Sequence, residues 1–138
     1  MKNFAVIFLL ALSPLIQQKT PSLGNQFIGS WHGTSICVDR KTDTACKDEE
    51  VVYVVKRIPS VRDTVEMEAF KIINSERVSM GTLNLQFSRS TDMWTFELAA
   101  RAHALWAFQV KDSTITGTLL EMPSKRLIRQ VQANRVHQ

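Results

Sequence analysis

The segment Leu83–Leu98, with the sequence LNLQFSRSTDMWTFEL, carries the pattern that decides the fold. The apolar side chains of Leu83, Leu85 and Phe87 alternate with polar ones, and the alternation resumes after the polar residues Ser88–Asp92. Alternation with a period of two is typical of strands with one buried face, because successive side chains point to opposite sides of a sheet. The segment therefore predicts two antiparallel strands joined by a hairpin loop.

The same pattern continues in both directions along the chain. Trp106, Phe108 and Val110 alternate with polar or small residues, and polar or proline-containing connectors separate the runs. Ala99–Phe108 has some helical propensity, but its strand-like flanks favour a hairpin over Arg101–Ala104. No other stretch outside the N-terminal segment predicts a helix. The predicted strands lie near residues 27–38, 49–58, 64–73, 77–88, 93–101, 104–111, 114–121 and 126–135.

Eight consecutive short strands, each with one apolar face, must bury those faces together. An all-β, eight-stranded antiparallel up-and-down barrel does this and also removes exposed sheet edges. A two-sheet β-sandwich is the alternative. A barrel of eight strands has an interior that side chains fill, or that holds one small ligand.

The N-terminal segment has the composition of a secretory leader. Lys2 precedes the apolar stretch Phe4–Ile16, which is too short for a bilayer span and fits a signal peptide. A buried N-terminal strand or helix is the alternative. We expect residues 1–22 to comprise the signal peptide and a flexible lead-in, and residues 27–138 to form a single barrel domain. The leader predicts export, to the periplasm or the extracellular space.

Composition and charge limit the class of partner. A chain of 138 residues allows one domain, and 44% hydrophobic with 22% charged residues is typical of a globular protein. If the leader is cleaved after Lys19, the remaining chain has 15 basic and 13 acidic residues. No run of Lys and Arg exceeds two residues, so we expect no nucleic-acid partner, and no stable membrane span in the mature form.

Cys37 and Cys46 are the two cysteines of the chain and enclose eight residues. In an exported protein this pair predicts a disulfide that clamps the connection between the first two strands. A redox or metal-binding pair is the alternative, but the spacing is not CxxC and no histidine flanks it.

The sequence predicts no metal site, no cofactor and no catalytic residues. His32, His103 and His137 form neither an HxH nor an HExxH pair. Glu66 and Glu68 lie two apart in a predicted strand, which favours a solvated strand face over acid–base catalysis. We therefore expect a protein that is not an enzyme.

Gly29-Ser30-Trp31 opens the first predicted strand. Here the chain resembles the lipocalin and fatty-acid-binding barrels (calycins), whose first strand begins with Gly-x-Trp. The resemblance implies that Trp31 packs across the closed end of the barrel, against a basic residue of the last strand. Arg129 is the first candidate for that residue and Arg135 the second, and either would add a cation–π contact.

Further short segments are similar to a set of small exported bacterial proteins described as lipocalin-like. That resemblance covers most of the mature chain and implies the barrel fold, but it brings no established activity. The segments are Gly29–Thr34, Cys37 with Ala45–Glu49, Val51–Tyr53, Lys71–Asn74, Met80–Leu83, Leu105–Phe108 and Thr116–Leu119.

Strand parity predicts which side chains face the interior. A lysine on the inward face needs an anionic partner, because an unpaired buried ammonium group is costly, so Lys71 is a candidate for binding an anionic head group. Alternatively, Lys71 extends from the barrel end and the aromatic side chains simply fill the core. The candidate ligand-binding residues are Tyr53, Met67, Lys71, Trp94, Trp106 and Phe108.

These observations favour an exported, non-enzymatic barrel that binds a small apolar or amphipathic molecule in its lumen, with Lys71 or Tyr53 orienting a polar end. The alternative is a protein-interaction module or enzyme inhibitor of the bacterial envelope, whose partner is an exported protein bound through residues 17–26 and the loop 39–48. A barrel with a filled core and a structural role is the third interpretation.

Overall fold

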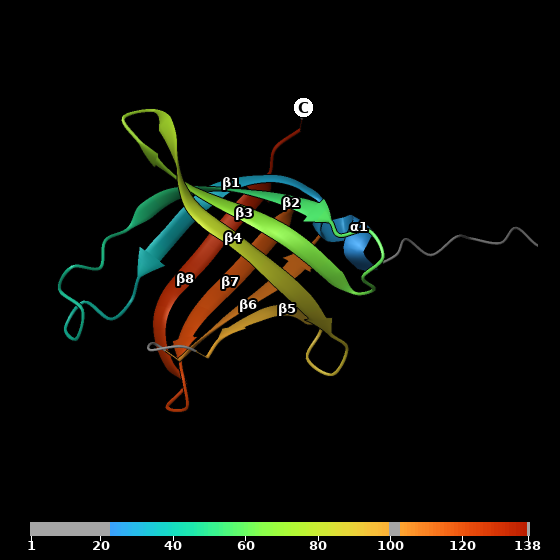
Figure 1. The fold of residues 1–138 in the computed structure, drawn as a ribbon. Helices are drawn as coiled ribbons and strands as arrows, with labels where there is room; N and C mark the ends of the chain where they lie inside the picture. The colour runs from blue at the N-terminus through green and yellow to red at the C-terminus, as the bar shows by residue number, and fades with distance from the viewer. Residues whose placement is uncertain (1–22, 100–102, 138) are drawn as a thin grey trace, which may run out of the picture.

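The chain folds into a closed eight-stranded barrel with a single short helix at one end (Figure 1). The computed structural model describes residues 23–99 and 103–137. Each strand pairs with the next in an antiparallel ladder, and the last strand pairs with the first. The elements are α1 (Leu23–Phe27), β1 (Gly29–Cys37), β2 (Glu49–Arg57), β3 (Thr64–Ile73), β4 (Glu76–Ser88), β5 (Met93–Leu98), β6 (Ala104–Lys111), β7 (Thr114–Glu121) and β8 (Arg126–Arg135).

The predicted fold class is confirmed, and the sandwich alternative is wrong. A sandwich would leave the first and last strands unpaired with each other, whereas β1 and β8 pair from Trp31 opposite Arg135 to Cys37 opposite Arg129. Two sequence-based predictions, the signal peptide in residues 1–22 and part of the hairpin over Arg101–Ala104, fall outside the described residues.

Helix α1 corrects the expectation that no helix follows the N-terminal segment, and the first strand begins at Gly29 rather than at residue 27. Phe27, at its end, is completely buried, and its carbonyl oxygen accepts a hydrogen bond from Trp31 Nε1 at 3.0 Å. A five-residue helix has no stability of its own in water. The burial of Phe27 in the barrel mouth therefore holds this turn in place, and that packing has no signature in the local sequence.

Arg135, the second of the two candidates, is the basic residue that packs on Trp31. Its guanidinium carbon lies 4.2 Å from the centroid of the Trp31 ring, and Nη1 donates to the Ile28 carbonyl at 2.7 Å. Gly29 makes this approach possible, because it has a φ of 134° and a Cβ there would lie 2.6 Å from Arg135 Nη1. Arg129 pairs with Cys37 at the opposite end of β8, so it cannot fill this role.

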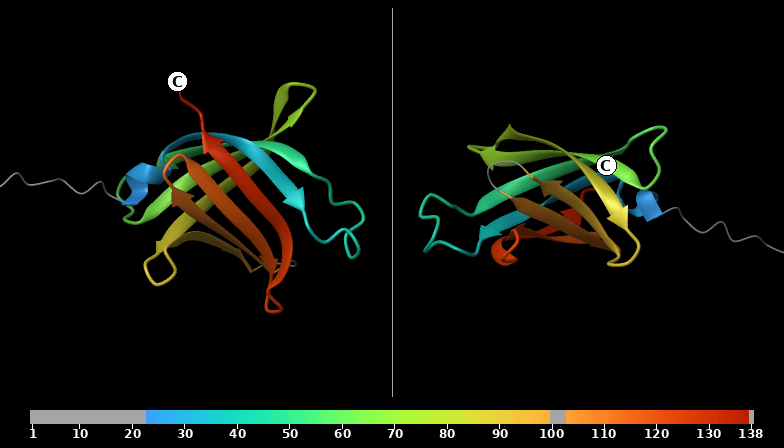
Figure 2. Two further views of the ribbon diagram at one scale, coloured as in Figure 1. Left: turned by 180° about the vertical axis from the view of Figure 1, so that it is seen from behind. Right: turned by 60° about the horizontal axis from the view of Figure 1, so that its bottom comes forward.

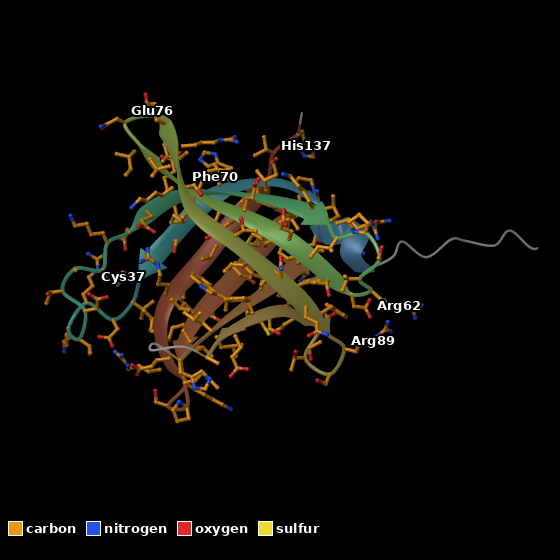
Figure 3. All side chains as sticks on the ribbon, viewed as in Figure 1. Cys37, Arg62, Phe70, Glu76, Arg89 and His137 are labelled. Carbon is orange, nitrogen blue, oxygen red and sulfur yellow. A yellow bond between two sulfur atoms is a disulfide. The ribbon has the colours of Figure 1, made fainter. Side chains whose placement is uncertain are left out.

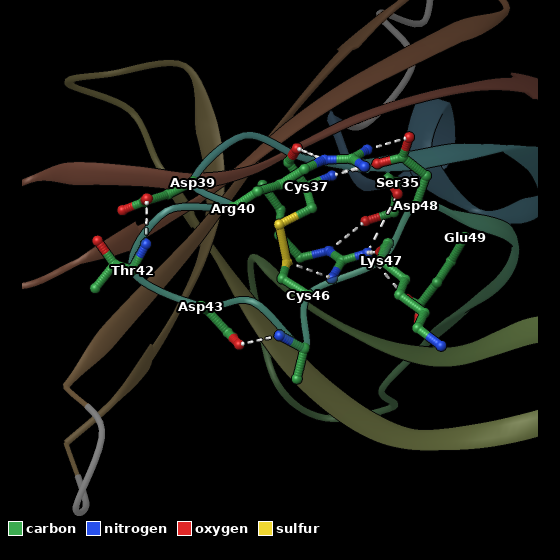
Figure 4. Close-up of a disulfide and its surroundings, with 12 residues drawn as sticks. Ser35, Cys37, Asp39, Arg40, Thr42, Asp43, Cys46, Lys47, Asp48 and Glu49 are labelled. Carbon is green, nitrogen blue, oxygen red and sulfur yellow. Dashed lines mark hydrogen bonds and ion pairs between the residues drawn. A yellow bond between two sulfur atoms is a disulfide. The ribbon is translucent and has the colours of Figure 1, made fainter.

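The loop 38–48, which contains Cys46, lies at the other end of the barrel from α1 (Figure 2). Cys37 and Cys46 form the predicted bond across the loop 38–48, with their Cα atoms 5.9 Å apart (Figure 4). The backbone N–H of Cys37 also donates to Asp48 Oδ1 at 2.9 Å, and Arg126 forms an ion pair with Asp39. The loop is thus fastened to the barrel at both of its ends and through β8.

The wall of the barrel is uneven between β3, β4 and β5. The β3 and β4 strands pair along their whole length and continue as a hairpin past the barrel, with Glu76 at its tip (Figure 3). A bulge in β4 leaves Met80 without a direct partner between Ser79 and Gly81. In contrast, β4 and β5 pair only at Gln86–Ser88 with Met93–Thr95. The first part of β4 therefore has no ladder partner on its β5 side.

We predict that Arg135→Ala lowers the free energy of unfolding by about 2 kcal/mol, because it removes a cation–π contact and charged hydrogen bonds to two carbonyl groups. Urea denaturation monitored by tryptophan fluorescence measures the change. The matched control is Arg89→Ala, because the Arg89 side chain is 73% exposed and its pair with Asp63 is a surface one. That control should cost less than about 0.5 kcal/mol. Equal effects of both substitutions would contradict the stacking role of Arg135.

Candidate functional site: a cavity at the disulfide end of the barrel

The interior of the barrel is filled at the α1 end and hollow at the disulfide end. The hollow half contains a cavity of about 160 Å³. Aromatic and apolar side chains from β2, β3, β4 and β6 form its walls, and polar side chains from β1, β2 and β8 form its rim. The lining residues are Ser35, Glu49, Tyr53, Ala69, Met80, Gly81, Leu83, Trp106, Phe108 and Arg129.

Three of the predicted ligand-binding residues line this cavity. The rings of Trp106 and Phe108 are stacked, with an interplanar angle of 11° and their centroids 5.6 Å apart. The Tyr53 ring meets Phe108 edge-on at 5.9 Å. Phe108 thus forms the floor of the cavity, and the other two rings form adjoining walls. The role of these residues in ligand binding stays a prediction.

Met67 and Trp94 face the interior but lie in its filled half. Met67 is fully buried and Trp94 is 3% exposed. The Trp94 ring packs against Phe27 at 5.5 Å and against Phe87 at 5.1 Å between centroids. Neither residue is among those that line the cavity. Their positions match the interpretation in which aromatic and apolar side chains fill the core.

Lys71 is half-buried on the inward parity of β3, two residues beyond Ala69 toward the projecting hairpin. It lies opposite the buried Val51 on β2 and Val78 on β4. The cavity lining, as the described residues define it, includes Ala69 but not Lys71. This placement favours the alternative in which Lys71 extends from the barrel end.

Arg129 holds the polar rim of the cavity together. Its Nε donates to the Ser35 hydroxyl at 2.9 Å, and Nη2 donates to the Ser35 carbonyl at 3.2 Å and to the Lys47 carbonyl at 2.7 Å. The same nitrogen lies 3.1 Å from Glu49 Oε2, and both side chains are largely shielded from solvent, at 14% and 26% exposed. The positive charge of Arg129 is therefore matched by a neighbouring carboxylate, which leaves the rim close to neutral.

Tyr53 is the polar group inside the cavity. The residue is 3% exposed, yet no described residue hydrogen-bonds its hydroxyl group. No fully buried side-chain polar atom in residues 23–99 and 103–137 lacks a partner, so this hydroxyl is not sealed in the core. It lines the cavity instead. Burial raises the pKa of Tyr53 above its ordinary value, with smaller opposing effects of Arg129, which lowers it, and Glu49, which raises it.

Asp48 sits beside this rim and stays ionised at neutral pH. The hydrogen bond from the Cys37 backbone N–H lowers the pKa of Asp48, and the ion pair with Arg40 at 2.6 Å acts in the same direction. The Asp48 side chain is 51% exposed and is not among the residues that line the cavity, so it contributes charge to the loop.

Two larger hollows lie on the outer face: one near His32 and Glu50, whose side chains are 2.6 Å apart, and one along β6, β7 and β8 that Ala107 lines. Among residues 23–99 and 103–137, no three His, Cys, Asp or Glu side chains are grouped closely enough to hold a metal ion. Within the same residues, no helix has the length and apolar character needed to cross a bilayer.

Comparison with known family models and with curated proteins finds no match for this chain.

Sequence reasoning did not identify Ser35, Glu49 or Ala69 as cavity residues. The parity that selected Tyr53 also places Glu49 on the inward face of β2, since the two residues are four apart in one strand. A parity argument extended to every strand would have found them. The ion pair of Glu49 with Arg129 depends on β8 lying beside β1, which parity within a strand does not reveal.

We predict that Tyr53 does not ionise until well above pH 10, because burial disfavours the tyrosinate. Tyr53 is the single tyrosine of the chain, so absorbance at 295 nm reports on it alone. The unfolded chain loses this proton near its ordinary pKa of 10.0, so the native state binds one more proton above that pH. The contribution of Tyr53 to the free energy of unfolding should therefore be constant below pH 10 and fall by about 1.4 kcal/mol per pH unit above it.

The matched control is Tyr53→Phe, in which this part of the pH dependence should disappear. A tyrosine that titrates near pH 10 in the native protein would show that the hydroxyl is open to solvent and would contradict the described cavity.

Proposed function

We propose that the protein is an exported, non-enzymatic, lipocalin-like barrel that binds a small apolar or amphipathic molecule in its lumen. The observation that carries the proposal is the cavity at the disulfide end, with its aromatic walls and the unpartnered hydroxyl of Tyr53. Concave, mostly apolar sites with a few converging polar groups are the usual form of small-molecule sites in proteins.

The size of the cavity limits the part of a ligand that it encloses. A cavity of about 150 Å³ lined by apolar side chains can hold a benzene molecule. The volume of about 160 Å³ is of that order, so it encloses one small ring or a short branched chain. A long acyl chain or a haem group would not fit without displacing core side chains such as Phe108.

Two features support export. The apolar segment Phe4–Ile16 after Lys2 has the composition of a signal peptide. The Cys37–Cys46 disulfide would persist in an oxidising compartment such as the periplasm or the extracellular space. Cell fractionation with a C-terminal epitope tag tests this part, and protein retained in the reduced cytoplasm would contradict it.

The proposal of a non-enzymatic role rests on the carboxylates of the cavity rim. Glu49 is engaged by Arg129, and Asp48, beside the rim, is bound to the Cys37 backbone and to Arg40, so both carboxylates already have partners. A general acid would need a carboxyl group whose pKa is raised toward neutral pH.

The alternative is that the protein binds an exported protein. One observation favours such binding, and it concerns the β3–β4 hairpin rather than residues 17–26 or the loop 39–48. The projecting β3–β4 hairpin exposes Ile73, Val78 and Met80, at 44%, 40% and 42%. The adjoining part of β4 has a free backbone edge on its β5 side. An extended segment of a partner can add to such an edge. If this is the function, Val78→Asp should abolish capture of the partner and leave ligand affinity unchanged.

We predict that toluene binds in the cavity and that Ala69→Leu lowers its affinity at least tenfold, because the larger side chain occupies cavity space between Tyr53 and Gly81, the two residues that pair with Ala69. Isothermal titration calorimetry measures the affinity, and native mass spectrometry of protein from the exported fraction tests for a natural adduct. The matched control is Ala107→Leu, the same substitution on the outer face of β6, where a separate groove leaves room for it. It should leave toluene affinity within twofold. Absence of both an adduct and toluene binding would overturn the proposed function.

A further inference from the structure

We propose that the cavity selects neutral, planar aromatic molecules of the size of phenol or indole, through a hydrogen bond with Tyr53 supported by Ser35. This inference rests on the proposed function and specifies the chemical class of its ligand. Three features of the cavity carry it: the shape of its walls, the donors at its polar end, and the balance of charge at its rim.

The walls favour a flat ligand. Trp106 is stacked on Phe108, and Tyr53 meets Phe108 edge-on at 69°, so the lining of the cavity is largely aromatic. Aromatic rings pack best in offset-stacked or edge-to-face arrangements, which such a lining can offer to an inserted ring. Gly117 fixes the floor, because a Cβ there would lie 2.6 Å from the Phe108 ring. The volume of about 160 Å³ limits the inserted group to one or two small rings.

The polar end provides unsatisfied hydroxyl groups. The Tyr53 hydroxyl has no partner among the described residues, and it can both donate and accept a hydrogen bond. The Ser35 residue is 2% exposed, and its oxygen accepts the hydrogen bond from Arg129 Nε. That arrangement commits a lone pair of Ser35 and leaves its O–H free to donate to a ligand. A single hydroxyl group on the ligand would meet both, whereas a ring N–H could only donate, to the Tyr53 oxygen.

The charge balance disfavours ionised head groups. Arg129 is the cation nearest to the cavity, and it is paired with Glu49 at 3.1 Å and bonded to the carbonyl groups of Ser35 and Lys47. A carboxylate on the ligand would have to displace Glu49 or lie beside it. Lys71, the cation expected from parity to receive an anionic group, is not part of the cavity lining given by residues 23–99 and 103–137. Loss of hydration of a charged head group would therefore be uncompensated.

Phenol, toluene and benzoate test these features one at a time, since they share a ring and differ in one substituent. At pH 7 phenol is neutral and benzoate is ionised. We expect phenol and toluene to bind, and benzoate to bind at least tenfold more weakly than phenol. In ¹H–¹⁵N spectra the indole N–H of Trp106 should shift on addition of phenol, while that of Trp31, bonded to the Phe27 carbonyl at the far end, should not.

The variants Tyr53→Phe and Ser35→Ala distinguish the effect of hydrogen bonds to the ligand from the effect of cavity volume. Tyr53→Phe removes only an oxygen, and we expect it to lower phenol affinity about three- to tenfold, as the loss of one hydrogen bond predicts. Toluene affinity should stay the same or rise. Ser35→Ala should also lower phenol affinity. Thermal melting confirms that each variant is folded, and Thr95→Ala on the outer face of β5 is the neutral control.

Each outcome decides between the two proposals. If toluene does not bind, this inference fails; if no natural adduct is found either, the proposed function fails with it. If toluene binds but benzoate binds as tightly as phenol, or Tyr53→Phe affects phenol and toluene equally, the inference alone is overturned and a general apolar cavity remains. If phenol shifts Trp31 rather than Trp106, the ligand occupies another part of the molecule and the site is wrong.

Discussion

The pairing of β8 with β1 is the constraint on which the rest of the molecule depends. It closes the barrel, and it requires a close approach at Gly33, where a Cβ would lie 2.0 Å from the Gln132 carbonyl oxygen. Arg129 and Arg135 lie six residues apart on β8 and so share its inward face. The same strand therefore supplies the cation that seals the α1 end over Trp31 and the cation that holds the rim of the cavity.

Much of the fold follows from the period-two pattern. The observed bounds of β3, β6, β7 and β8 match the predicted ranges, and β5 ends three residues early, at Leu98. Strand periodicity identifies each strand and its buried face. A closed barrel is one of the few arrangements in which eight such strands have no exposed sheet edge. Helix α1 and the bulge at Met80 were not predictable this way. Each is set by contacts with distant residues, and a single turn or a single extra residue leaves no period to detect.

The sequence predicts which side chains face the barrel interior, but it does not predict where along the barrel axis the cavity lies. Parity correctly places Tyr53, Met67 and Trp106 toward the interior, yet it does not distinguish the filled half, which holds Met67, from the hollow half. That distinction depends on how far Phe27 reaches into the barrel. The partner of Trp31 depends in the same way on register, since in an antiparallel pair the end of β8 lies beside the start of β1.

The short ladder between β4 and β5 has a consequence for how the closed barrel behaves in time. Three residue pairs, from Gln86 with Thr95 to Ser88 with Met93, join these strands, the fewest of any neighbouring pair in the described barrel. Regions with few backbone hydrogen bonds open locally at a free energy below that of global unfolding. We therefore expect this seam to open before the β1–β8 closure does. Leu83, a residue of the cavity wall, lies on β4 just beyond the seam, so such an opening would expose the cavity.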